Sequence, residues 1–398
     1  MYSITLWYNN GVKNPLVRRL APLFIAKFLL CFVFWYSIEK LFMYSIGFND
    51  ASIGLMAAIY AVMSVFMEVP SGVLADRWSR KGVMILSALS MLLSSYFGWI
   101  SNDPSLYVVS AAFWGFFDAL ASGTGSAMIY DLLKEEQGHT RNYDKILGRF
   151  EMLGGIALII SALLGGWLAS ATSLRSAFFA TIITAGLAAV ILLFYRDTTI
   201  HKQSTDAKLI EHTKGTFAAV FKNPDLAWLV VVMLVVFLVQ KMNGEFYQLW
   251  YAALSMPAAL FGIAGAIITG TYSSGGAIVR FFATRRRVLL ALAVCFISAI
   301  GMTISPSFWL TVGLQFVIGT LSFALVLALT SKMQHYLPSK YRAGAGSVIN
   351  TVGRLIFIPC ALLFGFLSNT MSIFVAGSMT VVFIGIGLFA EFHARSEK

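Results

Sequence analysis

Charged side chains are rare in this chain, and several of them interrupt long runs of apolar residues. Asp118 lies in the middle of one run, beside Trp114, Phe116 and Phe117 and with no basic residue close in sequence. An ionisable side chain at the centre of a membrane helix costs roughly 2.5–3.5 kcal/mol on insertion scales, so it is a functional candidate by default. Burial favours the neutral form of a carboxyl group. We therefore predict that Asp118 carries a proton or contacts a substrate; a hydrogen-bonded structural carboxyl is the alternative.

Polar residues also interrupt two apolar runs in the second half of the chain. Arg354 lies near the middle of one run, with Asn350 one helical turn before it. A buried guanidinium stays protonated and needs an anion, for which Asp118, Glu245 and a substrate carboxylate or phosphate are candidates. In the other run, Lys241 and Glu245 are four residues apart, so they share a helix face and can form an ion pair. We predict that these residues line a substrate cavity.

Two further residues are assigned to the same cavity. Gln248 extends the helix face of Glu245 by about one turn, and Trp35 is the aromatic candidate from the first apolar run. Between the charged residues, Asn243-Gly244 is expected to weaken the helix locally, because discontinuous helices are common at membrane binding sites.

Another group of charged residues lies toward one end of its apolar runs. Glu68 lies about two turns from the end of the second run and is the second candidate for proton coupling. Asp131, Arg149 and Glu151 lie near the same end of their runs, and Arg342 precedes a later one. Opposite charges at a similar depth can pair. We predict that they form a buried ion network that acts as a gate or brace.

These side chains must be positioned by membrane-spanning helices. The 398 residues are 58% apolar and 12% charged, whereas a soluble domain averages roughly 45–50% and about 25%. This composition excludes a soluble enzyme, a disordered chain and a disulfide scaffold. The apolar runs have the length of about 20 residues that a spanning helix needs, not the ~10 of a barrel strand. We expect twelve spans, at residues 21–44, 51–75, 82–100, 106–133, 146–170, 175–194, 226–253, 257–281, 288–304, 308–331, 344–367 and 371–391.

The positive charges predict the orientation of these spans. Of the 29 Lys and Arg residues, nearly all lie in the N-terminal segment, the tail and alternate connections, which places both termini in the cytoplasm. Lys27, Lys40, Lys241 and Arg354 lie inside spans and away from these segments. Lys40, with Glu39 beside it, is expected to extend to the membrane interface, as long charged side chains often do. The net charge of +11 is thus a topology signal, and no nucleic-acid partner is expected.

The longest connection divides the chain. It is polar, and it separates six expected spans from six, which predicts a first half at 1–195, a cytoplasmic loop at 196–225 and a second half at 226–398. Paired six-helix halves are typical of transporters built from repeats. The three cysteines lie inside apolar runs, and we expect neither a disulfide nor a metal site nor a cofactor.

One motif resembles that of a known family. Residues 72–81 read Gly-Val-Leu-Ala-Asp-Arg-Trp-Ser-Arg-Lys, which resembles the conserved loop after the second helix of the major facilitator superfamily, with Ser79 where that family usually has Gly. The resemblance implies an all-α fold of twelve membrane helices in two pseudo-symmetric halves. It also implies a cytoplasmic latch for the outward-facing state. The latch residues would be Gly72, Asp76, Arg77, Arg80 and Lys81.

Other segments resemble bacterial exporters of this superfamily, notably residues 68–72, 122–131 and 338–343. We therefore expect a monomeric secondary transporter of the bacterial inner membrane that works by alternating access. The first expectation is proton-coupled export of small or amphipathic organic compounds. The alternative is proton-linked uptake of an organic anion through Arg354. A membrane-embedded enzyme is a remote alternative, because no catalytic nucleophile accompanies Asp118 and Arg354, and a channel would need polar rings that the sequence lacks.

Overall fold

The computed structural model describes residues 15–198, 215–221, 226–305 and 307–393, with the backbone alone at 68, 69, 71–73, 75–77, 339, 340 and 342–344. All regular structure in these ranges is helical. Ten of the described helices are long and apolar enough to cross a membrane. Contacts divide the chain into two compact units, residues 1–36 with 66–204 (unit 1) and residues 37–65 with 205–398 (unit 2). The predicted halves differ from these units in the placement of residues 37–65, and their boundaries stay a prediction.

The first expected span is not one continuous helix. It consists of α2 (Pro15–Leu30), a non-helical stretch at 31–35, the short helix η1 (Tyr36–Ile38) and α3 (Glu39–Ser45). Side chains of α9 (Leu174–Leu193) satisfy the backbone of this stretch: the N–H of Phe34 donates to Thr181 Oγ1 at 3.1 Å, and Thr184 Oγ1 donates to the carbonyl of Phe32 at 3.2 Å. Irregular backbone at membrane depth is tolerated only where protein groups bond it in this way.

The fourth expected span is divided as well. It comprises α6 (Pro104–Ala121) and α7 (Thr124–Gln137). Gly123 lies between them with a φ of +72°, a left-handed conformation that glycine adopts without steric cost. At its other end, α6 begins where the Asp103 carboxylate accepts the N–H groups of Ser105 and Leu106. Hydrogen bonds from Ser105 and Leu106 hold the pKa of Asp103 below its ordinary value.

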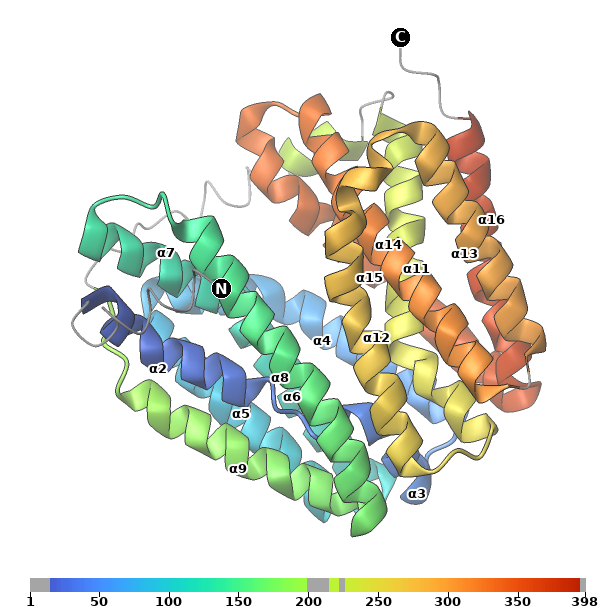
Figure 1. Cartoon of the computed structure of the whole chain (residues 1–398), viewed down its shortest axis with the longest axis horizontal. Coiled ribbons are helices and arrows are strands. Elements are labelled where there is room, and N and C mark those ends of the chain that lie inside the picture. Colours follow the sequence, from blue (N-terminus) through green and yellow to red (C-terminus); the bar gives the residue numbers. More distant parts are fainter. Residues whose placement is uncertain (1–14, 199–214, 222–225, 306, 394–398) are drawn as a thin grey trace, which may run out of the picture. The chain divides into compact units, whose positions relative to one another are not determined.

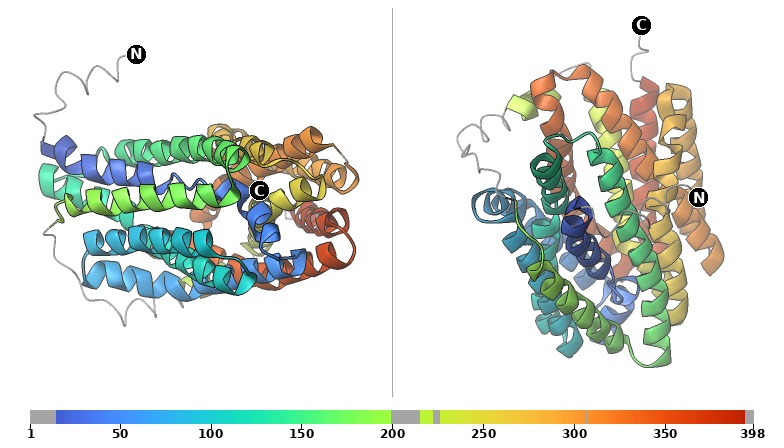
Figure 2. Two further views of the ribbon diagram at one scale, coloured as in Figure 1. Left: turned by 90° about the horizontal axis from the view of Figure 1, so that it is seen from below. Right: turned by 60° about the vertical axis from the view of Figure 1, so that its left-hand side comes forward.

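The described part of unit 1 contains three further helical segments. They are α5 (Arg80–Ile100), α8 (Tyr143–Ala171) and the end of α4 (Asp50–Arg77), whose first part belongs to unit 2. In unit 1, α5 packs against α6 and α9, while α2 packs against α8 and α9 (Figure 2).

Unit 2 is built around α11 (Ala227–Ala253). This helix contacts α14 (Phe308–Tyr336), α15 (Ser339–Thr370) and α16 (Ile373–His393). The other members are α12 (Ala258–Ile278), η3 (Val279–Ala283) and α13 (Arg285–Ile304). The 21 residues of α12 have the length of a span, but its second half is rich in Gly, Ser and Thr and it is not among the ten. The early segment α3, blue in Figure 1, lies against the yellow α11.

The first part of α4 runs antiparallel to α15 within unit 2. Ser368 on α15 donates to Asp50 at the start of α4, and Gly54 approaches Gly365. Arg354, earlier on α15, donates to the hydroxyl of Ser64, about three turns after Gly54 on α4. Residue numbers therefore increase along α4 in the direction in which they decrease along α15. This packing aligns the polar residues of α15 with those of α4.

Candidate functional site

An ion pair lies on the wall of a cavity in unit 1. Lys27 Nζ, in the last turn of α2, lies 2.9 Å from Glu151 Oε2 on α8 and 5.0 Å from the centroid of the Phe150 ring. The cavity has a volume of about 110 Å³. Its other walls are mainly apolar, with small polar residues near the break between α6 and α7: Leu23, Ala26, Leu30, Cys31, Met84, Phe117, Ala121, Gly123, Gly125 and Ser126. Such a site suits a compound with an apolar body and a polar end.

Asp118 lies next in sequence to a residue of the cavity wall. It is half-buried in the last turn of α6, where its carbonyl accepts the N–H of Ser122 at 3.0 Å. The neighbouring Phe117 lines the cavity. The expected mid-helix carboxyl therefore lies next to a helix break, the kind of place where membrane transporters position groups that bind ions and substrates.

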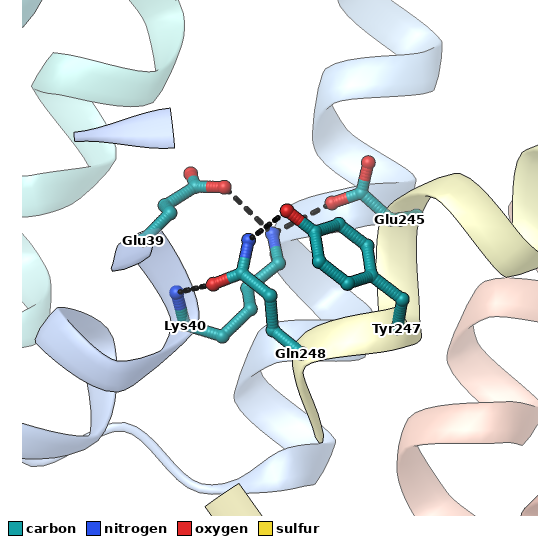
Figure 3. A network of polar contacts seen from close by, with 5 residues as sticks. All are labelled: Glu39, Lys40, Glu245, Tyr247 and Gln248. Carbon is teal, nitrogen blue, oxygen red and sulfur yellow. Dashed lines mark hydrogen bonds and ion pairs between the residues drawn. The ribbon is translucent and has the colours of Figure 1, made fainter. Parts of the chain in front are cut away.

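A polar network in unit 2 is centred on Lys40 (Figure 3). The Lys40 ammonium lies 3.0 Å from Glu39 Oε2 and 2.7 Å from Glu245 Oε1 on α11. The backbone N–H of Lys40 donates to Gln248 Oε1 at 3.0 Å, and Gln248 Nε2 donates to the Tyr247 hydroxyl at 3.2 Å. One ammonium thus holds two carboxylates and joins α3 to α11.

This network corrects two expectations. Lys40 does not extend to the membrane interface: it is only 4% exposed, because carboxylates on both sides hold its ammonium inside unit 2. Glu245 was expected to pair with Lys241, one turn away on the same helix; Lys241 does attract the Glu245 carboxylate electrostatically, but the ammonium in hydrogen-bond contact with it belongs to Lys40. The weakening expected at Asn243 is not seen either, since α11 is continuous there and the breaks lie in the first and fourth spans.

The Asn243 side chain has a different role from the expected one. Its amide donates to the carbonyl of Gln315 on α14 at 3.2 Å, and the Tyr251 hydroxyl donates to Gln315 Oε1 at 2.5 Å. These bonds connect α11 to α14 and satisfy buried polar groups.

Arg354 contacts a neutral group in unit 2. Its guanidinium donates to the hydroxyl of Ser64 on α4. Among the residues that the structure describes, no carboxylate lies within the 4.0 Å ion-pair distance of Arg354. Asn350, one turn earlier on α15, is exposed. A guanidinium offers five N–H donors, and among the described residues Arg354 donates to a neutral hydroxyl.

Trp35 is enclosed in unit 1. Its indole N–H donates to Ser95 Oγ at 3.1 Å, and its ring stacks on Phe178 with centroids 5.2 Å apart. It is 2% exposed. In this arrangement Trp35 packs and orients the helices of unit 1.

The described part of the motif at 72–81 braces unit 1. Arg80 forms an ion pair with Asp131 on α7 and donates to the carbonyl of Ala127 at 2.8 Å, while Lys81 donates to the carbonyl of Leu193 at 2.7 Å. Ser79 caps α5 by accepting the N–H of residue 82. The serine at this position therefore stabilises the start of α5.

The other latch and gate residues divide between described and undescribed positions. The side chains of Glu68, Gly72, Asp76, Arg77 and Arg342 lie outside the described part of the structure. The described gate residues form separate contacts instead of the single network that was predicted. Asp131 pairs with Arg80, and Glu151 pairs with Lys27. Arg149 is half-buried on α8.

Sequence reasoning missed Lys27 and Lys40 as site residues. Both are basic residues inside expected spans, and they flank the break in the first span. The available signal was their location, because a buried cation in a membrane needs an acidic partner. Local spacing could not supply that partner, since Glu151 and Glu245 are 124 and 205 residues away in sequence.

Comparison with known proteins decides the family. The family model described as Major Facilitator Superfamily matches residues 20–359. The chain belongs to this superfamily. It is therefore a multi-pass membrane transporter rather than an enzyme, as the motif at 72–81 predicted.

Curated relatives match the chain over part of its length. The tetracycline resistance protein, class H, of Pasteurella multocida is 26% identical over 188 residues, which are 46% of this chain and 44% of that protein. The inner membrane transport protein YajR of Escherichia coli is 25% identical over 45% of this chain and 38% of its own length. The chain thus matches less than half the length of these superfamily members.

Solved structures show the same fold over nearly the whole chain. The nucleoside transporter NupG aligns with a TM-score of 0.74 and 15% identity, covering 95% of this chain and 98% of that one. An inward-facing bacterial homologue of the human lysosomal transporter Spinster gives 0.74 at 16% identity, covering 96% and 98%. The D-xylose–proton symporter gives 0.70 at 13%, covering 94% and 97%.

Proposed function

We propose that this transporter exports small or amphipathic organic compounds by alternating access. The observation that carries the proposal is the unit 1 cavity, where apolar and aromatic residues line the wall beside the partly exposed Lys27–Glu151 pair. Opposite charges on the wall keep the site close to neutral, which suits a neutral or amphipathic cargo more than an ion of one sign. Similarity to a tetracycline resistance protein over part of the chain supports export.

We assign the energy source to the proton gradient. Asp118 is the first candidate for the coupling carboxyl because it is half-buried beside the break between α6 and α7. Glu68 is the second. The same proposal places the transporter in the inner membrane of a bacterium as a monomer, with both termini in the cytoplasm. It also includes the latch centred on Asp76.

A transport assay tests this function. The purified chain is reconstituted into lipid vesicles, a pH gradient is imposed, and the movement of an amphipathic fluorescent dye is followed. We expect dye to move against its concentration gradient as protons move the other way, and an ionophore that collapses the gradient to stop it. Dye movement that is the same with and without the imposed gradient contradicts proton-coupled export.

Arg354 favours a second candidate, proton-linked uptake of an organic anion. Its contact in unit 2 is the hydroxyl of Ser64, and no described carboxylate lies within ion-pair distance. A half-buried guanidinium can bind an anionic group in a bidentate manner. In the same vesicles, uptake of a radiolabelled carboxylate with protons, and no movement of the dye, would replace export by this function.

A further inference from the structure

A second, wider pocket opens at one end of unit 2. It has a volume of about 490 Å³ and lies where the connections α3–α4, α11–α12 and α15–α16 come together. Most of its wall is apolar, including Leu41, Leu249, Met256, Ile373 and Phe374. The charged residue in the wall is Asp50, the first residue of α4.

The Asp50 carboxylate is held by hydroxyl groups from two different helices. The Tyr44 hydroxyl on α3 donates to Oδ1, and Ser368 Oγ on α15 donates to Oδ2. A carboxylate offers about four acceptor positions, so two bonds orient it and leave further positions available. Among the described residues, no basic side chain lies within 4.0 Å of Asp50. Its negative charge is thus oriented but not neutralised by a described residue of this chain.

The rim of the pocket also contains the end of helix α11. Ser255, in the connection after α11, has a φ of +54° and is the one non-glycine residue of the described chain with a positive φ. This conformation ends α11: the N–H groups of Ser255 and Met256 donate to the carbonyls of Ala252 and Tyr251, as in a common left-handed helix cap. The cap places Ser255 on the same pocket wall as Asp50.

We propose that this pocket binds an organic cation with an apolar body, whose ammonium group contacts Asp50. An ammonium supplies the charge-assisted hydrogen bonds that the free acceptor positions of the carboxylate can take. An anion would be repelled by Asp50. A bare metal ion would need several more oxygen or nitrogen ligands, and the described residues contain no metal-binding cluster. The site goes beyond the proposed function, because it lies in a different unit from the export cavity and does not depend on the direction of transport.

Binding to the purified full chain in detergent tests the proposal. Isothermal titration compares 1-naphthylmethylamine with two molecules of similar shape, neutral 1-naphthylmethanol and anionic 1-naphthoate. We expect saturable binding of the amine, binding of the alcohol weaker by about tenfold or more because a charged hydrogen bond is lost, and no saturable binding of the carboxylate. Equal affinities for the amine and the alcohol would overturn the proposal.

Variants show whether the amine occupies this pocket. Asp50→Asn should remove the preference for the amine over the alcohol, whereas Asp144→Asn, at an exposed position of unit 1, should retain it. Ala253→Trp places a bulky ring at an exposed point of the pocket wall without touching the carboxylate and should weaken binding of the amine. Thermal unfolding checks that each variant is folded. Unchanged amine binding in either Asp50→Asn or Ala253→Trp refutes the site.

Discussion

Gly54 on α4 and Gly365 on α15 bring two helix backbones into direct contact. A β-carbon built on Gly54 would lie 2.6 Å from the carbonyl oxygen of Ala361 and 2.8 Å from the α-carbon of Gly365. Small residues allow membrane helices to approach this closely. The contact lies between the hydrogen bonds at Asp50 and at Arg354, so it sets how α4 and α15 align.

Gly54→Ala should therefore destabilise unit 2. The added methyl would press against backbone that cannot move aside alone, and overpacking of this kind costs about 1–3 kcal/mol. Thermal unfolding in detergent measures the effect. Gly155→Ala on α8 is the control, because its β-carbon would meet no atom within 4 Å and alanine is favoured over glycine within a helix. A Gly54→Ala protein as stable as the control contradicts the close contact.

Removal of the Lys40 ammonium should be strongly destabilising. Lys40→Met leaves Glu39 and Glu245 facing each other without their cation, and breaking a buried ion pair costs about 3–5 kcal/mol. The double variant Lys40→Met with Glu245→Gln should recover part of this loss, because one uncompensated charge is removed. The exposed Lys134→Met is the matched control. If Lys40→Met melts at the same temperature as this control, the network does not stabilise unit 2.

Asp76→Asn tests the latch. Asp76 contributes little to membrane orientation, so its loss should leave the protein inserted and folded while abolishing most transport. Transport rate per inserted molecule is the measurement, with expression and detergent gel filtration as checks. Normal transport by a well-expressed Asp76→Asn protein removes the latch from the proposal.

Asp118→Asn tests the coupling carboxyl. An amide side chain stays neutral near pH 7 and cannot bind and release a net proton, so accumulation driven by a pH gradient should fall to passive equilibration. Exchange of substrate for substrate, which needs no net proton movement, should continue. Asp144→Asn is the control for loss of one acidic residue from unit 1. If gradient-driven accumulation persists in Asp118→Asn, the coupling site lies elsewhere and Glu68 is tested next.

Arg354→Lys distinguishes the two candidate functions. Lysine keeps the charge but lacks the planar two-pronged donor that grips a carboxylate. A transporter of organic anions should then lose affinity by about tenfold or more, measured as the substrate concentration for half-maximal uptake. A transporter in which Arg354 only holds Ser64 should change little. Unchanged affinity for an anionic substrate excludes the anion site.

The sequence by itself determined the membrane class, the superfamily and most of the spans. Composition and run length are local properties, and the motif at 72–81 is a contiguous string, so both can be read without coordinates. The sequence also shows, without coordinates, which charged residues lie inside spans and so need a partner. Asp118 and Arg354 are predicted site residues on this ground, because the cost of an ion in hydrocarbon depends on depth rather than on a particular fold.

The tertiary structure alone decided which charges meet and where helices break. Lys40 finds Glu245 across 205 residues and Lys27 finds Glu151 across 124, because packing of distant helices, rather than helical spacing, brings these side chains together. The break in the first span depends likewise on Thr181 of α9, which bonds the exposed backbone. A run of apolar residues predicts a continuous helix unless a distant helix supplies hydrogen bonds to replace its own, and that information lies only in the fold.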